Sequence, residues 1–170
     1  MDGSIDPGAA APPVPLVELA PAVGAADLEL ARTLFREYAG TLGFPLDFQD
    51  FERELAELPG EYAEPGGTIV LARVGGAIAG CVALRPLAAA GACEMKRMYV
   101  RPEFQGRGLG RRLGERILAD ARARGYRVMR LDTIDTMRPA IALYEDLGFR
   151  RIPPYRYNPI AGALYFEAEL

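Results

Sequence analysis

Three glycines alternate with other residues in the run Gln105-Gly-Arg-Gly-Leu-Gly110, between a strand-like segment and an amphipathic one. Glycine has no Cβ, so the backbone can turn tightly and an anion can approach the main chain. The first N–H groups of a helix have no partner within the helix, and the helix dipole adds positive charge at that end. The run is therefore typical of a phosphate-binding turn.

Two other phosphate motifs do not match this run. The spacing of Gly106, Gly108 and Gly110 differs from the dinucleotide pattern G-x-G-x-x-G, and no Gly-Lys-Ser/Thr follows as in a P-loop. A glycine-rich turn also occurs where a helix packs closely on a sheet. The run alone therefore does not distinguish a phosphate-binding turn from a turn that lets a helix pack closely on a sheet. The neighbouring segments are needed to distinguish them.

Proton chemistry has few candidates, because the sequence contains no histidine. That removes the commonest general base, the usual activator of serine or cysteine nucleophiles, and the commonest metal ligand. Proton transfer must use carboxylates, tyrosines, the sole lysine Lys96, or water, and we expect no metal.

Cys81 and Cys93 have small apolar neighbours, so we expect reduced, buried side chains, with a disulfide as the alternative.

The composition is that of a soluble globular protein: half of the 170 residues are apolar and a quarter are charged. We expect a mobile tail over residues 1–14, rich in Ala, Pro and Gly, and one domain over 15–170.

The net charge of −3 disfavours nucleic acid and anionic membranes as partners. Without a membrane-length apolar run or a signal-like start, we expect a cytoplasmic location. The sequence leaves a homodimer open.

Apolar periodicity and turn residues divide the chain into alternating elements. Helices are predicted over residues 25–42, 47–58, 108–124 and 139–147, and strands over 14–19, 68–74, 77–87, 93–100, 127–133, 149–152 and 163–170. Gly75-Gly76 predicts a tight hairpin, and Pro102 ends the strand before the glycine run. This order predicts an α+β domain on a mixed sheet.

The segment from Glu94 to Gly110, followed by a helix, a strand and the run Ala140-Ile-Ala-Leu-Tyr-Glu-Asp-Leu-Gly-Phe149, resembles the GNAT superfamily of acyl-CoA-dependent N-acetyltransferases. The resemblance covers the C-terminal half in motif detail and nearly the whole chain in the order of elements. It implies a mixed, mostly antiparallel sheet with helices on both faces and a splayed central strand pair that holds acetyl-CoA.

The same resemblance implies which residues bind the cofactor. The pyrophosphate would lie on the amides of residues 105–110, and the pantetheine arm would pair with the main chain of residues 98–100. Arg107 and Arg111 would add charge, unless they are an ordinary solvated helix end. The expected cofactor-binding residues are Met98, Tyr99, Val100, Gln105, Gly106, Arg107, Gly108, Leu109, Gly110 and Arg111. Family members often have asparagine where this chain has Met137, so that side-chain contact is in doubt.

The resemblance also implies catalytic roles for two residues. Glu94 would be the base that accepts the amine proton, directly or through water, and Tyr144 the acid that protonates the CoA thiolate. An ordinary phenol is protonated at neutral pH, as that role requires. In the alternative reading Glu94 pairs with Lys96 or an arginine on the sheet, and Tyr144 is a core residue on an apolar helical stripe.

The segment after the second motif is a candidate acceptor site, because the corresponding loop of the family overhangs the acceptor. We expect Tyr155, Arg156, Tyr157 and Asn158 to bind a small substrate, with Arg156 pairing a carboxylate; the alternative is a proline-rich surface turn. The predicted reaction is direct acetyl transfer, in a ternary complex, to a primary amine of a small molecule such as an amino acid. A non-catalytic acyl-CoA-binding module and a protein N-terminal or lysine acetyltransferase stay open as alternatives.

Overall fold

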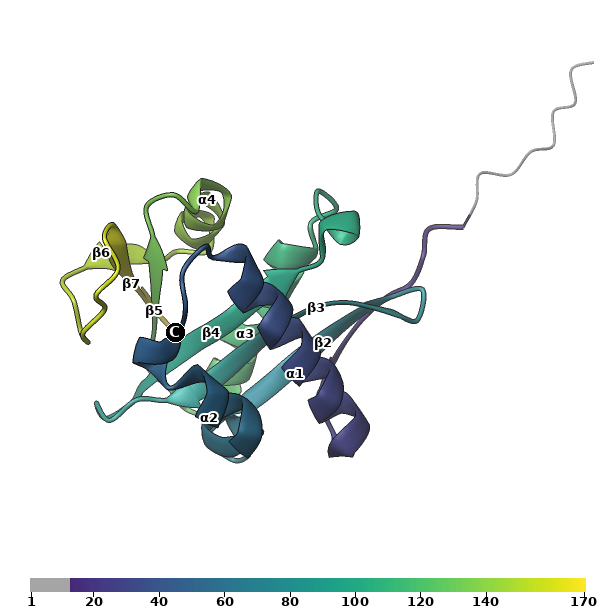
Figure 1. The fold of residues 1–170 in the computed structure, drawn as a ribbon, viewed down its shortest axis with the longest axis horizontal. Helices are drawn as coiled ribbons and strands as arrows, with labels where there is room; N and C mark the ends of the chain where they lie inside the picture. Colours follow the sequence, from purple (N-terminus) through teal and green to yellow (C-terminus); the bar gives the residue numbers. More distant parts are fainter. Residues whose placement is uncertain (1–12) are drawn as a thin grey trace, which may run out of the picture.

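Seven strands form one continuous sheet in the computed structural model, which describes residues 13–170 (Figure 1). The predicted tail therefore lies almost entirely outside the described residues. The strands are β1 (Val17–Pro21), β2 (Thr68–Val74), β3 (Ala77–Pro86), β4 (Ala92–Val100), β5 (Val128–Ile134), β6 (Arg150–Ile152) and β7 (Ala163–Glu169). Their spatial order is β1-β2-β3-β4-β5-β7-β6, and only the β4–β5 pair is parallel.

Four α-helices cover the two faces of this sheet. They are α1 (Gly24–Thr41), α2 (Phe51–Glu57), α3 (Leu109–Ala123) and α4 (Arg138–Asp146), with short 3₁₀ turns η1 (Asp47–Gln49), η2 (Gly60–Tyr62) and η3 (Pro102–Phe104). Helices α1 and α2 lie in front of the sheet in Figure 1, and α3 lies behind it. The predicted mixed, mostly antiparallel sheet with helices on both faces is confirmed.

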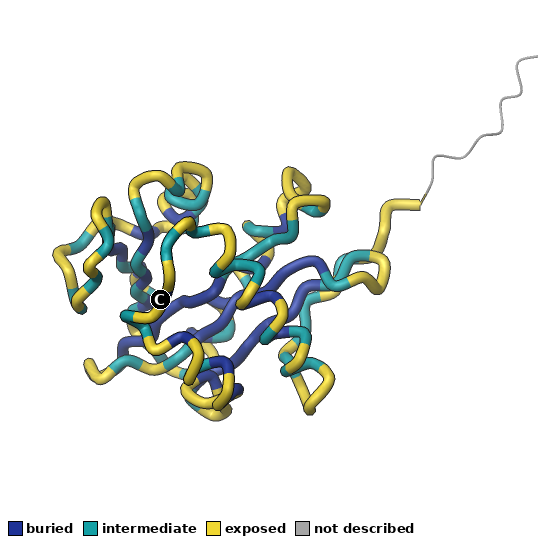
Figure 2. The backbone as a smooth tube through the Cα atoms, viewed as in Figure 1, coloured by how far each residue is buried: buried dark blue, intermediate teal, exposed yellow. Residues whose placement is uncertain are grey.

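Each face of the sheet has its own hydrophobic core, because alternate residues of a strand point to opposite faces. On β2, Val70 packs into the cluster beneath α3 and Leu71 into the cluster beneath α1 and α2. Figure 2 shows the buried strands enclosed by more exposed helices and loops. Cys81 and Cys93 belong to these opposite clusters and are both free thiols, which confirms the prediction that they are reduced and buried.

The central strand pair separates soon after it forms. Strands β4 and β5 pair only from Ala92 with Val128 to Glu94 with Arg130. Beyond Glu94 the strands part, so the main chain of residues 95–100 has β3 on one side and no paired strand on the other. The predicted splay of the central pair is therefore present, and it lies directly after the residue predicted to be the base.

A β-bulge on β4 changes which residues face α1 and α2. Arg97 has a φ of 57°, and the β3–β4 register shifts opposite it. Its guanidinium Nε donates to Glu54 Oε1 of α2 at 3.0 Å, and its Cζ lies 5.0 Å from the centre of the Phe51 ring. The bulge places Lys96 and Arg97 on the same side of the sheet, whereas strict alternation would have separated them.

Two boundaries differ from the prediction. Strand β1 begins at Val17, later than residue 14, and the helix predicted over 47–58 is interrupted. Asp50 adopts the left-handed conformation with a φ of 58°, which ends η1 before α2 starts. An α-helix does not tolerate that backbone conformation in its interior, so one predicted helix becomes two short elements.

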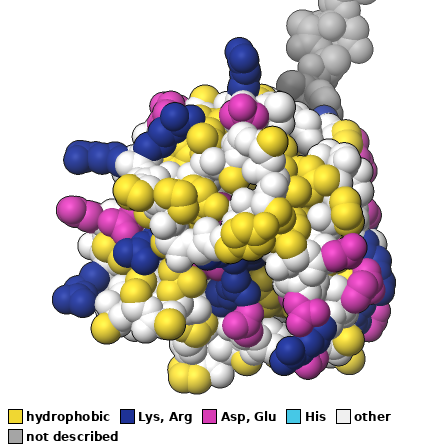
Figure 3. Space-filling view, turned by 60° about the vertical axis from the view of Figure 1, so that its left-hand side comes forward, with side chains coloured by type: hydrophobic (Ala, Val, Ile, Leu, Met, Phe, Trp, Pro, Cys, Tyr) yellow, Lys and Arg dark blue, Asp and Glu magenta, His cyan; other side chains and the backbone are white. Residues whose placement is uncertain are grey.

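The surface agrees with the small net charge. Acidic and basic side chains are interspersed among apolar ones on the face that Figure 3 brings forward, so this face carries no field of a single sign. Within residues 13–170, no helix has the length and apolar character needed to cross a membrane.

Gly80→Ala should destabilise the fold, because a Cβ at this position of β3 would overlap the carbonyl oxygen of Tyr99 on β4. Such overpacking typically costs about 1–3 kcal/mol. Gly40→Ala is the matched control: this helical position has open space, and alanine should gain up to about 1 kcal/mol. Urea unfolding would measure both changes. Equal effects of the two substitutions would contradict the packing described here.

Candidate active site

Two cavities meet where β4 and β5 part. The larger, about 560 Å³, lies between the end of β4, the glycine turn and α4; the smaller, about 50 Å³, lies between the parted strands and is covered by the end of α1, the loop after it and η1. Met98, Met137 and Tyr144 line both cavities. A ligand in one cavity and a ligand in the other would therefore meet beside the Tyr144 side chain.

The glycine turn has the open geometry that an anion needs. Gly106 and Gly108 have φ values of 75° and 74°, and a Cβ at either position would meet no atom within 4 Å. Helix α3 begins directly afterwards at Leu109, so its first amides face the same region. The Gln105 side chain donates to the Val100 carbonyl oxygen at 2.9 Å and ties the turn to β4. These features fit a pyrophosphate in the larger cavity.

The predicted cofactor residues are brought together, with one exception. All of them except Arg107 line the larger cavity. Arg107 is exposed, and Arg111 forms a surface ion pair with Asp146 at 3.0 Å. Met137 also lines this cavity, so an apolar thioether occupies the place where the family often has an amide.

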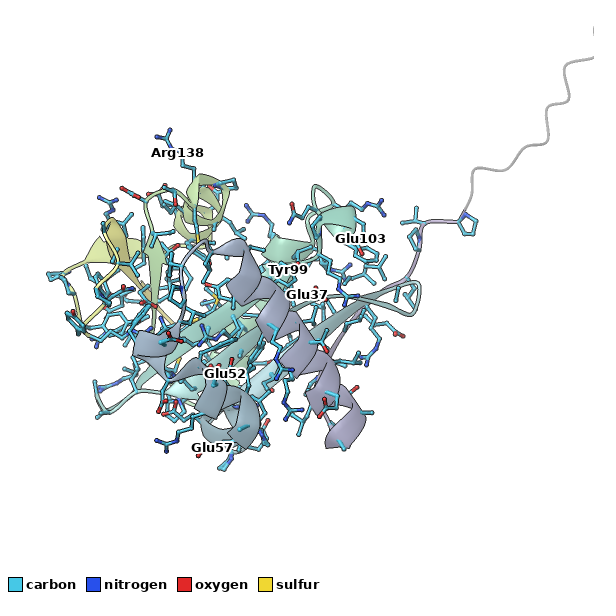
Figure 4. All side chains as sticks on the ribbon, in the orientation of Figure 1. Glu37, Glu52, Glu57, Tyr99, Glu103 and Arg138 are labelled. Carbon is cyan, nitrogen blue, oxygen red and sulfur yellow. The ribbon has the colours of Figure 1, made fainter. Side chains whose placement is uncertain are left out.

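The end of β4 is also tied to α1 beside the larger cavity. Tyr99 and Glu37 are neighbours in Figure 4, and Arg101 Nη2 donates to Glu37 Oε1 at 2.7 Å. Arg138, at the start of α4, projects away from the protein in the same view. The cavity wall therefore includes a strand end that an ion pair attaches to the helix in front of the sheet.

Tyr144 lies at the junction of the cavities on the inner side of α4. It is 8% exposed, and its ring packs edge-on against Phe149 with centroids 6.0 Å apart. Burial raises the pKa of its phenol above the usual value, so the group stays protonated at neutral pH. Tyr144 thus packs as a core residue and also lines both cavities.

Glu94 is fully buried and lines neither cavity. Its carboxylate accepts hydrogen bonds from the Tyr155 hydroxyl at 2.7 Å and from Arg85 Nε at 2.8 Å, and Arg156 Nη1 lies 3.3 Å away. Burial alone would raise the pKa of Glu94, but the charges of Lys96, Arg156 and Arg85 hold it below its usual value. The contacts match the paired-carboxylate alternative, and the base role stays a prediction.

The predicted acceptor residues form a network with Glu94 and Asp132. Arg156 Nη2 donates to Asp132 Oδ1 at 2.8 Å, and Asn158 Nδ2 donates to Asp132 Oδ2 at 3.0 Å. Of the four predicted residues, only Asn158 lines the smaller cavity, and Tyr157 is 82% exposed. The guanidinium of Arg156 is thus bound to carboxylates of the chain itself.

Several polar residues of the smaller cavity were not predicted to be there, among them Gln49, Lys96 and Asp132. Lys96 is 5% exposed, and its Nζ donates to Gln49 Oε1 at 2.9 Å. Burial, together with the nearby charges of Arg97 and Arg156, lowers the pKa of Lys96 to about 7 against the opposing effect of Glu94 and Asp132. Asp132 shares β5 with Arg130 and Thr133, so its residue type was only a weak signal, and Gln49 had none.

A metal centre is not formed by the described part of the chain: residues 13–170 bring together no group of three acidic, cysteine or histidine side chains that could hold an ion. The two thiols are equally unsuited to nucleophilic chemistry. Burial raises the pKa of Cys81 well above its usual value, and burial with the Glu94 charge raises the pKa of Cys93 to about 12.

Known proteins resemble this chain in sequence and in fold. An N-acetyltransferase of Schizosaccharomyces pombe, described as uncharacterized, is 41% identical over 85% of this chain and 89% of its own length. The N-acetylaspartate synthetase of Danio rerio is 32% identical over 58% of this chain and 36% of its own length. An acetyltransferase structure from Streptococcus agalactiae superposes with a TM-score of 0.74 at 20% identity, covering 91% of this chain and 98% of that one.

The family model described as "Acetyltransferase (GNAT) family" matches residues 29–149. That range runs from α1 to the end of the second motif and includes the parted strands, the glycine turn and Tyr144. With the sheet order, the open turn and the relatives in agreement, the chain belongs to the acetyltransferase (GNAT) family of acyl-transferring enzymes.

Proposed function

We propose that this enzyme transfers an acetyl group from acetyl-CoA to the primary amine of a small molecule of the amino acid class, by direct transfer in a ternary complex. The meeting of the two cavities at Tyr144 carries this proposal. Acetyl-CoA would supply the activated acetyl group from the larger cavity. The chain's own part is to hold an amine in the smaller cavity, beside a proton donor.

The cofactor side is supported by the shape of the larger cavity. It extends from the glycine turn along the free edge of β4 to Tyr144, which suits a long ligand with a phosphate at one end. The turn and the first amides of α3 would bind the pyrophosphate. Backbone groups of residues 98–100 would pair with the amides of the arm as a neighbouring strand does.

The acceptor side is supported by the size and lining of the smaller cavity. About 50 Å³ suits a small acceptor or one end of a larger one. Its cover is apolar, with Leu42, Phe44, Leu46 and Phe48, and its polar lining includes Gln49, Lys96, Asp132 and Asn158. Groups of both charges suit a molecule that carries an ammonium and a carboxylate. The similarity to an N-acetylaspartate synthetase adds support for an amino acid.

Direct transfer is favoured over a covalent intermediate by the state of the two thiols. Cys81 and Cys93 are the only cysteines in the sequence, both are buried, and both have raised pKa values. No histidine exists in the chain to activate either one. The amine would therefore attack the thioester itself, and Tyr144 would donate its hydroxyl proton to the departing thiolate.

A panel of the twenty common L-amino acids and simple primary amines tests the function directly. With acetyl-CoA and the full chain, release of free thiol should depend on the amine, and mass spectrometry should show a product 42 Da heavier than that amine (about one acetyl group). Amine-independent thiol release would indicate thioester hydrolysis and contradict transfer to an amine. Coenzyme A binding with neither thiol release nor product would support the non-catalytic module instead.

Gly108→Asp should weaken coenzyme A binding at least tenfold, because it places a carboxylate where the phosphates are expected and strains a position with a φ of 74°. Gly125→Asp is the matched control. Gly125 has a φ of 81° and equally open surroundings but follows the other end of α3, roughly 20 Å along the helix axis. Calorimetry would compare the two variants, and equal losses of affinity would argue against the phosphate turn.

Tyr144→Phe should lower kcat tenfold or more and leave coenzyme A affinity nearly unchanged, because general acid catalysis typically contributes about 10²–10⁴-fold. Tyr126→Phe is the control: its hydroxyl donates to the Gly66 carbonyl oxygen at 2.6 Å, away from both cavities. Steady-state thiol release would measure both. Unchanged turnover in Tyr144→Phe would remove the acid role.

A further inference from the structure

We propose that Lys96 is the proton acceptor that converts the acceptor's ammonium group into a nucleophilic amine. This inference rests on the proposed function and gives a definite role to a residue that the sequence placed only among several possible groups for proton transfer. Lys96 lines the smaller cavity, whose other wall is shared with the cofactor cavity at Met98, Met137 and Tyr144. A base for the acceptor has to lie in the acceptor's own cavity, and Lys96 does.

The hydrogen bonding of Lys96 leaves capacity for a ligand. A charged lysine has three N–H donors and a neutral one has two donors and a lone pair. The contact to Gln49 uses one N–H of the amino group. In the neutral form the lone pair is then available to a proton in the cavity, while Gln49 fixes the position of the nitrogen.

Charged and titratable groups surround Lys96 from every packed element. On β4 they are Glu94 and Arg97, on β5 Asp132, on the loop before β7 Arg156, on α2 Glu54, and on α1 Tyr38. Arg97 and Glu54 pair with each other, and Arg156 pairs with Glu94 and Asp132. Each of these charges thus has a partner other than Lys96, since Arg85 of β3 also binds Glu94, and burial makes the neutral form of the lysine accessible near pH 7.

The two carboxylates near the cavity are weaker candidates for the same role. Glu94 is bound by Tyr155, Arg85 and Arg156 and lines neither cavity. Asp132 lines the cavity, but Arg156 and Asn158 occupy one oxygen each. Burial alone would raise the pKa of Asp132, but the charge of Lys96 and these two donors hold it below the usual value. An efficient base has a pKa close to the working pH, and two strongly stabilised carboxylates do not.

The proposed step balances without a further reactant. The acceptor's ammonium gives one proton to neutral Lys96, and the freed lone pair attacks the thioester carbonyl carbon. The new C–N bond forms as the C–S bond breaks, and the departing thiolate takes the hydroxyl proton of Tyr144. The nitrogen then gives one of its two protons to the phenolate and keeps the other as the N–H of the amide. Lys96 then releases its proton to water, so the net products are the N-acetyl amine, free thiol and one proton.

The titration of Lys96 can be measured without knowing the acceptor, because it is the only lysine in the sequence. In an untagged chain labelled with [ε-¹³C]lysine, NMR should show one lysine signal, and its pH midpoint should lie within about one unit of 7. Gln49→Leu should move that midpoint, which identifies the group with the cavity. A midpoint above about 9, near that of ordinary lysine, would overturn the proposal.

Catalysis provides the second test, with the amino acid that reacts fastest in the panel above. Lys96→Arg keeps a positive charge but cannot take up a proton near neutral pH. Lys96→Arg and Lys96→Met should each lower kcat about 100-fold or more, with coenzyme A affinity unchanged. In the wild type kcat/KM should rise with pH through the NMR midpoint. Glu94→Gln and Asp132→Asn should each keep an inflection but move it to lower pH, because each removes a negative charge that raises the pKa of Lys96.

The outcomes separate this inference from the proposed function. If the wild type transfers acetyl groups but Lys96→Arg stays within tenfold of it, Lys96 acts through its charge, as an anchor for a carboxylate, and the proposal fails. If Glu94→Gln removes the inflection, Glu94 is the base and the proposal fails likewise. Absence of transfer by the wild type is a failure of the proposed function, whatever midpoint NMR finds.

Discussion

The site depends on the early separation of β4 from β5. Three residue pairs join these strands, and both cavities open beyond the last of them, at Glu94 and Arg130. Backbone groups that a sheet would normally satisfy are left at the edge of a cavity, where a ligand's amides can use them. The gap persists because helices cover both faces: α3 packs on β3 and β4 from behind, and α1 packs on the same strands from the front.

Ion pairs replace part of the missing strand pairing. Glu94 on β4 and Asp132 on β5 both bind Arg156, which lies on the loop before β7. Buried charges are costly unless they are paired and hydrogen-bonded, and here each carboxylate also has a neutral donor, from Tyr155 or Asn158. The loop is thereby attached to both strands across the gap, which fixes their separation on the front face of the sheet. Lys96 lies beside this network of ion pairs.

The sequence was informative where the relevant pattern is local. The glycine turn, the strand before it and the helix after it are neighbours along the chain, so residue type and spacing suffice to predict them. The same holds for Tyr144, whose position on the inner side of α4 follows from helical periodicity. The splayed strand pair came from the resemblance to a family, since pairing between distant strands leaves no periodic trace within either one.

The parts that could not be predicted depend on contacts between distant segments. The left-handed residues Asp50 and Arg97 break one helix and shift one strand, although neither is glycine. Arg156 was expected to bind a substrate carboxylate, and its nearest carboxylates belong to β4 and β5, 62 and 24 positions earlier (156 − 94 and 156 − 132). Spacing along the chain cannot indicate which charged residues come into contact in the fold. The sequence therefore shows that Lys96 is the only lysine, but it does not show that Lys96 lines a cavity.

The two segments that enclose the smaller cavity are held in place by different kinds of contact, and this bears on how such enzymes can diverge. The loop that carries Arg156 and Asn158 is held by their contacts with buried carboxylates. Replacing either residue would leave a carboxylate in the interior without that partner. The cover formed by Leu42, Phe44, Leu46 and Phe48 is held by apolar contact, which tolerates changes of size and shape. New acceptor preferences should accordingly arise in the cover during evolution, while the ionic loop is inherited with little alteration.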